Sequence, residues 1–383
     1  MKHILTVAAL AALLAAPLQA IPAFARKYGT PCSLCHDPVP KLNAYGEQFA
    51  ARGYVLSDED TTGTTSLGDP LLRLNTSLPL AIRLDAYVRA QGGERVGSDF
   101  ETPTVAKLLS GGQLARNVSF YIYFLLAERG ATGPIEDAWL MFRRPFALPV
   151  DVTVGQFQIA DPVWKRELRI TLENYQILSQ RIGAGAANLS YDRGITVGAQ
   201  LTGNTALFAE IVNGNGIGEA QSGSFDGDAP KTGVLWLTQQ MGPLRLSGLG
   251  YYGAQRVVPT GGGPGIRNRT WMAGPAVTYG SGPFELNAQY VYREDSDPWF
   301  DGSRRARTNG GFLELLWWPQ RHGGRALVTG LYNWVDAEAA PNYETATLNL
   351  SWLWARNIRL AAEGTWDFLA EQPRVALGVV TAF

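Results

Sequence analysis

The chain has 383 residues, of which 46% are hydrophobic and only 17% are charged, and its formal net charge is −1. A charge so close to neutral gives no reason to expect nucleic acid as a partner, because nucleic-acid binding needs a concentrated basic surface. The 43 glycines, 15 tyrosines and 11 tryptophans favour many β-strands joined by glycine-rich turns.

Residues 1–20 have the pattern of a secretory signal. A basic start at Lys2 and His3 precedes a long apolar run, which small residues follow. Cleavage is expected after Ala20 or after Ala25. After this signal no apolar stretch reaches the roughly 18 to 20 residues that a membrane-spanning helix needs.

The motif Cys32-Ser33-Leu34-Cys35-His36 follows the signal closely. Cys-x-x-Cys-His is the spacing at which two thiols are bonded to the vinyl groups of a haem. We therefore predict one covalent haem c, bound through Cys32 and Cys35, with His36 as the proximal ligand of the iron.

A disulfide and a zinc site are two other interpretations of this motif, and the sequence supports them less well. Cys32 and Cys35 are the only two cysteines of the chain, so they are not part of a larger disulfide framework. A redox disulfide of the thioredoxin type would lie near a βαβ pattern, which the sequence lacks. A zinc site would need two more ligands, and His322 is the only other histidine beyond the signal.

Residues 21–66 are predicted to form a small cytochrome segment. Lys41–Arg52 has the spacing of one short helix with Leu42 and Phe49 on one face, and Ser57–Gly68 has the composition of a linker. About 40 residues cannot cover both faces of a haem. We expect this segment to plug the lumen of the larger domain that follows it.

Residues 67–383 are predicted to form an all-β, transmembrane barrel of the outer-membrane type, with about 16 antiparallel strands. In the last strand Val375, Leu377 and Val379 alternate with polar or small residues, as expected where one face meets lipid and the other the lumen. Short turns such as Met241–Pro243 interleave with longer loops such as Asn213–Thr232, as periplasmic turns interleave with extracellular loops.

Strand positions follow from the same alternation. The segment Tyr175–Ala186 is the expected sixteenth strand, whereas Pro103–Gly111 is expected to be a short helix or a loop insertion. The other strands, about fifteen, are predicted to begin near residues 80, 117, 135, 150, 194, 205, 233, 244, 270, 283, 309, 325, 343, 357 and 373.

The sixth ligand of the haem iron is not supplied by residues 21–66, which contain no methionine and no second histidine. The barrel offers Met141, Met241, Met272 and His322. Met141 is expected on the lumen face of its strand and His322 in a short turn, and these two are the tentative distal ligands. For each of the four, a plain structural role is the stronger interpretation.

The N-terminal run resembles that of the fused cytochrome-porin family, whose best-known members are outer-membrane iron oxidases. Weaker similarity continues into the barrel, and Arg26-Lys27-Tyr28 stands where those enzymes usually have a glutamine and a threonine, which leaves the donor open. The resemblance rests on Pro22-Ala23-Phe24-Ala25-Arg26, Cys32-x-x-Cys35-His36, Pro40-x-Leu42-Asn43, Gly46-x-x-Phe49 and Gly53-Tyr54.

The resemblance implies a function in electron transfer at the outer membrane. In that family a monohaem cytochrome segment precedes the barrel, and electrons pass from extracellular Fe(II) through the haem toward periplasmic carriers. The implied partners are outer-membrane lipid, an extracellular donor such as Fe(II), and a periplasmic carrier such as a soluble cytochrome c. The alternative is a porin for small solutes whose haem-bearing segment is a plug or gate, and a third interpretation makes the barrel an anchor for a larger complex.

Overall fold

The computed structural model describes residues 23–57, 60–77, 79–92, 97–220, 223–257, 265–302 and 304–383. The predicted signal peptide at residues 1–20 lies outside the described residues. No helix within those ranges is long and apolar enough to cross a membrane.

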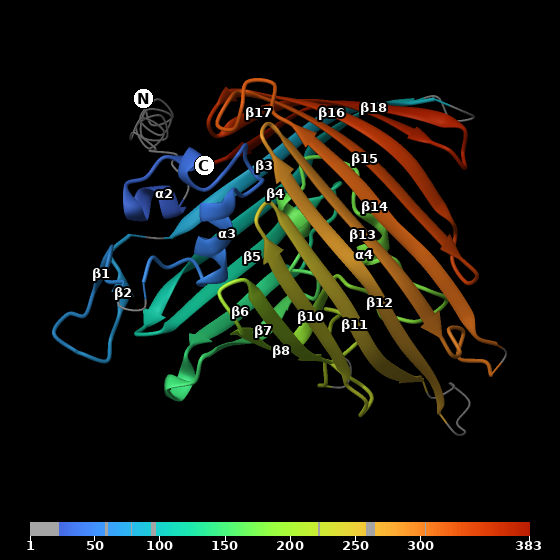
Figure 1. Cartoon of the computed structure of the whole chain (residues 1–383), viewed down its shortest axis with the longest axis horizontal. Helices are drawn as coiled ribbons and strands as arrows, with labels where there is room; N and C mark the ends of the chain where they lie inside the picture. Colours follow the sequence, from blue (N-terminus) through green and yellow to red (C-terminus); the bar gives the residue numbers. More distant parts are fainter. Residues whose placement is uncertain are drawn as a thin grey trace, which may run out of the picture.

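Sixteen antiparallel strands form one closed barrel (Figure 1), which confirms the predicted fold class. Each strand pairs with the next in sequence, and the last pairs with the first to close the ring. The strands are β3 (Leu80–Gln91), β4 (Gly97–Ala115), β5 (Val118–Glu128), β6 (Ile135–Arg143), β7 (Val150–Gln158), β8 (Tyr191–Gln200), β9 (Thr205–Val212), β10 (Thr232–Met241), β11 (Leu244–Val257), β12 (Ile266–Ser281), β13 (Phe284–Asp295), β14 (Ala306–Trp317), β15 (Ala326–Ala337), β16 (Tyr343–Ala355), β17 (Ile358–Asp367) and β18 (Gln372–Ala382).

The two faces of the strands separate as predicted. Leu377 is 59% exposed on the outer surface of β18, whereas its neighbour Ala376 is 5% exposed and faces inward. In β16 the outward Leu348 and Leu350 are half exposed, and Asn349 between them is fully buried. An apolar outer surface and a polar lumen are what a barrel in lipid requires.

The two ends of the barrel differ. Seven connections of two to eight residues join strands at one end, here called the short-turn end. The three connections longer than eight residues all lie at the opposite end: residues 159–190, 213–231 and 296–305. In bacterial barrels the short turns face the periplasm and the long loops face outward.

Two strand assignments made from the sequence were wrong. Tyr175–Ala186 is not a strand: it lies within the long connection 159–190 and contains the short helix α4 (Gln176–Ser179). The missing strand is β4, which includes Pro103–Gly111. The pairing of β3 with β4 shifts register between Asp85 and Tyr87, opposite Pro103, and a proline is tolerated at such a bulge because no ladder hydrogen bond is needed there.

The residues before β3 form a small plug, defined here as residues 23–57 and 60–75. It contains α2 (Ala23–Tyr28), the 3₁₀ turn η1 (Cys32–Leu34), α3 (Ala44–Ala51) and the hairpin of β1 (Thr64–Thr65) and β2 (Leu74–Asn75). The helix predicted at Lys41–Arg52 is therefore confirmed in shorter form. Two further 3₁₀ turns lie in connections of the barrel, η2 (Pro145–Ala147) and η3 (Arg166–Leu168).

Candidate functional site

The segment Cys32–His36, here called the haem motif after its predicted ligand, is folded into one tight turn. The backbone N–H groups of Cys35 and His36 both donate to the carbonyl of Cys32, at 3.2 and 2.9 Å. The thiols of Cys32 and Cys35 are unbonded and half-buried. Burial raises the pKa of both thiols, so both are in the protonated form at neutral pH.

His36 is oriented by its own loop. Its Nδ1 atom lies 3.0 Å from the carbonyl oxygen of Pro40. A carbonyl only accepts, so Nδ1 carries the proton and Nε2 is the nitrogen that can bind a metal ion. Burial lowers the pKa of His36, which favours the neutral ring that metal ligation needs.

This donor set fits a covalent haem c. Two unbonded thiols and one correctly oriented imidazole come from the same turn, in the spacing that haem attachment requires. Within the part of the chain that the structure describes, no group of three or more His, Cys, Asp or Glu side chains is arranged to hold a bare metal ion.

Helix α3 packs directly on the haem motif. The side chain of Asn43 caps the helix by accepting from the N–H of Gly46 at 3.0 Å, and the N–H of Asn43 donates to the carbonyl of Cys35 at 2.9 Å. A Cβ atom on Gly46 would lie 2.3 Å from that same carbonyl oxygen. Only glycine therefore allows α3 to approach the motif this closely.

Asp37, the residue after His36, anchors the motif to the β14–β15 turn. Its carboxylate accepts from His322 Nδ1 at 2.7 Å and from the backbone N–H of Gly323 at 2.8 Å. The indole N–H of Trp318 donates to its carbonyl at 3.2 Å. His322 Nε2 lies 3.0 Å from the carbonyl oxygen of Gly282, so both ring nitrogens of this tentative distal ligand face acceptor oxygens.

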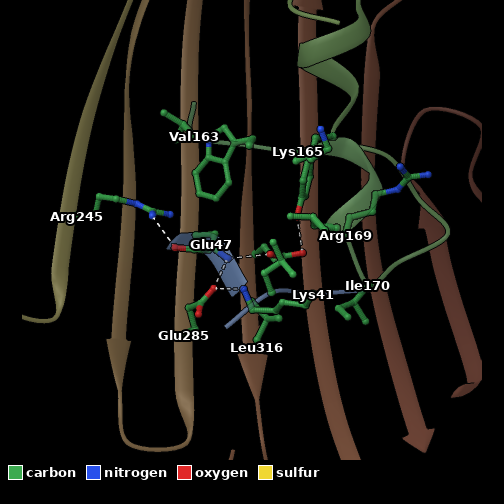
Figure 2. A pocket seen from close by; sticks show the side chains of 15 residues that line it. Lys41, Glu47, Val163, Lys165, Arg169, Ile170, Arg245, Glu285 and Leu316 are labelled. Carbon is green, nitrogen blue, oxygen red and sulfur yellow. Dashed lines mark hydrogen bonds and ion pairs between the residues drawn. The ribbon is translucent and has the colours of Figure 1, made fainter. Parts of the chain in front are cut away.

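A partly buried ion pair forms the second anchor. Lys41 Nζ lies 2.7 Å from a carboxylate oxygen of Glu285 on the lumen side of β13 (Figure 2). Burial acts to lower the pKa of Lys41, but the attraction of Glu285 outweighs it and the pKa is raised. Arg245 of β11 pairs with Glu47 of α3 at 3.2 Å on the same side.

Aromatic stacking forms the third anchor. Tyr54, just after α3, stacks on Tyr121 of β5 with ring centroids 4.6 Å apart and lies 6.2 Å from the ring of Trp139 on β6. Met141 of β6 packs inward, as predicted, and a Cβ atom on Gly53 would lie 3.1 Å from its sulfur. Gly46, near the start of α3, packs on Cys35, whereas Gly53 follows the end of this helix. The tentative ligand Met141 therefore contacts the end of α3 that lies away from the haem motif.

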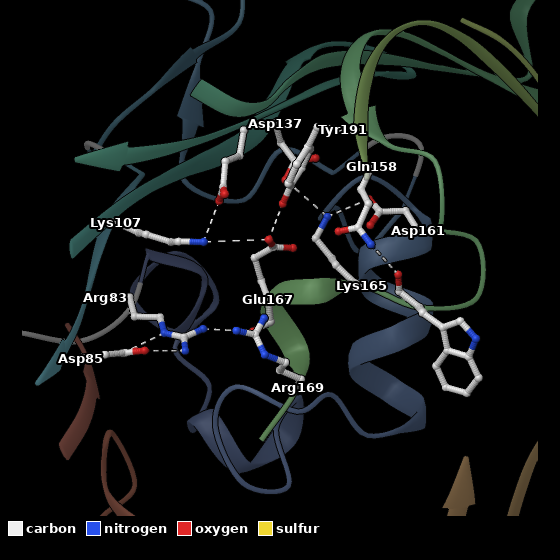
Figure 3. Close-up of polar contacts among 12 residues, drawn as sticks. Arg83, Asp85, Lys107, Asp137, Gln158, Asp161, Lys165, Glu167, Arg169 and Tyr191 are labelled. Atoms are coloured by element: carbon white, nitrogen blue, oxygen red, sulfur yellow. Dashed lines mark hydrogen bonds and ion pairs between the residues drawn. The ribbon is translucent and has the colours of Figure 1, made fainter. Parts of the chain in front are cut away.

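The long connection 159–190 folds back into the lumen and meets the plug there. Lys165 pairs with Asp161 at 2.8 Å and lies 3.5 Å from the buried Asp137 (Figure 3). Leu42 of the plug, Trp164 of this connection and Glu314 of β14 border the same small cavity of about 60 Å³. Space of that size holds only a few water molecules.

The residues that dock the plug were not identified from the sequence. Asp37 is 285 residues from His322, and Lys41 is 244 residues from Glu285. The only local signal was the position of Asp37 and Lys41 beside the haem motif. Their partners depend on the strand order of the barrel, which the motif does not encode.

Comparisons with known proteins bear on the barrel alone. No known protein family and no curated protein matches the chain by sequence. Among solved structures, the anion-selective porin of Comamonas acidovorans is 12% identical and superposes with a TM-score of 0.58 over 80% of this chain and 99% of its own. OmpT of Vibrio cholerae with loop L8 deleted is 10% identical, with a TM-score of 0.57 over 80% of this chain and 99% of its own.

A third similar structure is the outer-membrane channel DcaP of Acinetobacter baumannii. It is 13% identical, with a TM-score of 0.52 over 79% of this chain and 96% of its own. Identities this low show the fold only. The chain therefore has a porin-type barrel of sixteen strands, to which a plug bearing the haem motif is joined at the N-terminus.

Proposed function

We propose that the chain is an outer-membrane electron-transfer protein, a porin-type barrel whose plug carries one covalent haem c. It would transfer electrons between an extracellular donor, with Fe(II) as the first candidate, and a periplasmic carrier such as a soluble cytochrome c. The observation that carries this proposal is the single turn in which Cys32, Cys35 and His36 lie, with Nε2 of His36 left for the iron.

The location of the plug supports this function. Its residues Lys41 and Tyr54 contact lumen side chains of β13 and β5, so the haem motif is held at the short-turn end of a barrel with an apolar outer surface. That end faces the periplasm in barrels of this type. A plug docked there can exchange electrons with a soluble carrier on the periplasmic side.

The chain's own residues would position the cofactor and cover part of it. Haem c supplies a one-electron centre when it is bound, with a potential set by its ligands and by burial. The carbonyl of Pro40 fixes the ring of His36, and Gly46 lets α3 cover the motif. The inward connection 159–190 leaves a cavity of about 60 Å³ beside Lys41 and Leu42, so only a few water molecules fit between it and this side of the plug.

A second candidate function is a porin for small solutes that uses the plug as a gate. The superposition on an anion-selective porin and on an outer-membrane channel favours it. The polar lumen wall, with Asn349 and Glu314 buried along it, is also compatible with passage of polar solutes if the plug leaves.

Three measurements on the full-length protein in detergent test these functions. Alkaline pyridine spectra measure covalent haem, with Cys32→Ala/Cys35→Ala as the control that should have none. Stopped-flow absorbance after mixing with Fe(II) measures reduction of the haem. Planar-bilayer recordings measure conductance, which electron transfer does not require.

The outcomes separate the two candidates. We expect covalent haem, its reduction by Fe(II), and little conductance. Haem that is present but stays oxidised would exclude Fe(II) as the donor under those conditions, and electron transfer from another donor would remain the proposed function. Absence of covalent haem, together with a steady conductance, would overturn the proposal in favour of the porin.

A further inference from the structure

Glu314 is a carboxylate buried on the lumen side of β14, with 3% of its surface exposed. Both of its oxygens accept from neutral donors: Oε1 from the hydroxyl of Tyr175 at 2.9 Å and Oε2 from the amide of Asn287 at 3.0 Å. Among the residues that the structure describes, no cation forms an ion pair with it. Neutral donors offset only part of the cost of burying a carboxylate, so a proton competes for this group.

Hydrogen bonds connect Glu314 to the plug. The amide of Asn287 also donates to Glu285 at 2.9 Å, and Glu285 pairs with Lys41 at 2.7 Å (Figure 2). Lys41 follows His36 by five residues, and it borders the same small cavity as Glu314. The buried carboxylate therefore lies beside the segment that carries the haem motif.

Other charged side chains face this cavity from the plug, from two strands and from the inward connection. Lys41 and Glu47 of the plug are paired across the interface. Lys165 is paired with Asp161, and Arg169 donates to backbone carbonyls of its own connection. The titratable and charged groups around Glu314 are Lys41, Glu47, Lys165, Arg169, Tyr175, Arg245 and Glu285.

Protons can reach Glu314 from solvent. The cavity has a volume of about 60 Å³, which admits a few water molecules. Glu47 borders it as well, and the side chain of Glu47 is 48% exposed. Water in the cavity thus has contact with the surface between the plug and the wall.

We propose that Glu314 takes up one proton when the haem is reduced and releases it when the haem is reoxidised. The inference rests on the proposed electron-transfer function and adds a proton-binding residue to it. The extracellular donor loses one electron, the haem iron gains it as Fe(III) becomes Fe(II), and the carboxylate of Glu314 gains a proton from water in the cavity. Reoxidation by the periplasmic carrier reverses both changes, and no other bond forms or breaks.

The size of this coupling follows from Coulomb's law. Reduction removes one positive charge from the iron, which raises the proton affinity of a carboxylate nearby. For a separation of about 12 Å and an effective dielectric constant of about 20, the affinity changes about tenfold. By linkage, protonation favours the reduced haem by the same factor. The reduction potential should therefore fall, as the pH rises through the range where Glu314 titrates, by about 59 mV in total, which is a tenfold change for a one-electron couple.

Redox titrations of the full-length protein in detergent, from about pH 4 to about pH 9, test the proposal. The main variant is Glu314→Gln, which has no proton to exchange. The matched control is Glu363→Gln. Glu363 is also buried and accepts from neutral donors, the amide of Asn349 and two backbone N–H groups, but it borders a different cavity, which Arg129 of the β5–β6 connection also lines.

We expect the potential of the wild type and of the control variant to fall by about 59 mV over this pH range, and Glu314→Gln to lose this fall. Tyr175→Phe removes a hydrogen bond that favours the ionised carboxylate, so it should move the fall to higher pH by about one unit. The same fall in Glu314→Gln as in the wild type would overturn the proposal. Should Glu314→Gln not fold, the absence of a shift in Tyr175→Phe would overturn it.

Covalent haem is measured on the same samples, so that the two proposals can fail separately. Absence of covalent haem would overturn both the electron-transfer function and the proton uptake. Covalent haem whose potential does not depend on pH would overturn the proton uptake and leave the electron-transfer function.

Discussion

The carboxylate of Asp37 lies 2.7 Å from Nδ1 of His322 and so joins the residue after His36 to a turn of the barrel wall. The same carboxylate accepts from the backbone N–H of Gly323, and the other ring nitrogen of His322 lies 3.0 Å from the carbonyl oxygen of Gly282. Position and orientation of the haem motif are thus set by the barrel as well as by the plug. The variants below separate these contributions.

Replacing Asp37 by alanine should loosen the plug without unfolding the barrel. The change removes two hydrogen bonds to a charged group, so we expect docking to weaken by about 1–2 kcal/mol, or roughly tenfold in the undocked population. Planar-bilayer recordings should show more frequent openings. Asp37→Asn, which keeps an acceptor, should have a smaller effect, and an unchanged conductance in Asp37→Ala would show that this contact does not hold the plug.

Replacing Lys41 by methionine should be costly because it leaves Glu285 without its partner beside the buried Glu314. We expect plug docking to weaken by about 2–3 kcal/mol, somewhat less than for a fully buried pair. The double variant Lys41→Met/Glu285→Gln should recover part of the loss. Cleavage rates of the plug by a protease specific for arginine, whose sites these variants leave unchanged, measure the coupling in a double-mutant cycle, and strictly additive effects would contradict a direct interaction.

The stability of the plug should depend on Tyr28 in a pH-dependent way. Burial disfavours the ionised form of Asp60, but the hydrogen bond from Tyr28 at 2.6 Å and those from the backbone of Thr62 and Leu56 outweigh it, and the pKa of Asp60 is lowered. A lowered pKa means stability that is present above the ordinary carboxyl range, near pH 4, and is lost as the pH falls through the folded value.

We therefore expect Tyr28→Phe to weaken the plug by about 1 kcal/mol at neutral pH and by less below about pH 4, where Asp60 takes up a proton. The ratio of proteolysis rates between variant and wild type at each pH cancels the pH dependence of the protease. Tyr45→Phe, at an exposed position of α3, is the control. A ratio independent of pH would exclude Asp60 as the group that responds.

Replacing Gly46 by alanine should lower the yield of covalent haem. The new Cβ would lie 2.3 Å from the carbonyl oxygen of Cys35, so α3 must move away, at a cost of about 1–3 kcal/mol. Gly248→Ala on β11 is the matched control, because no atom lies within 4 Å of its added Cβ. Equal haem yield in the two variants, measured by pyridine spectra, would show that this packing is not needed for attachment.

Much of the barrel could be predicted from the sequence, because apolar and polar side chains must alternate along a strand that lies between lipid and a polar lumen. β4 was missed because Pro103 is normally excluded from a strand, and a bulge that tolerates it leaves no clear signature. Within the connection 159–190, Tyr175–Ala186 was wrongly predicted to be a strand because of its apolar residues. Ile177 and Leu178 are apolar because they pack against a lumen cluster, and a strand facing lipid would use the same residue types.

The residues of the candidate site also fall into two groups, those that the sequence indicates and those that only the fold brings together. The haem-binding roles of Cys32, Cys35 and His36 follow from spacing within five residues, so they can be proposed from the sequence alone, and they stay a prediction. The docking contacts of Asp37, Lys41 and Tyr54 could not be predicted, because each joins the plug to a strand distant in sequence. Position on the lumen wall is decided by strand order and register, which only the three-dimensional structure provides.

The barrel closes along a seam where β18 pairs with β3, and Ile82 exchanges two backbone hydrogen bonds with Phe383 there. Contacts between chain ends so distant in sequence form late in folding, because the entropy of closing a long loop must first be overcome. The plug immediately precedes β3, and two of its three anchors bind residues in the second half of the chain, His322 and Glu285. If haem c is attached as proposed, we expect attachment to Cys32 and Cys35 before the seam closes, while the plug is not yet docked on these strands.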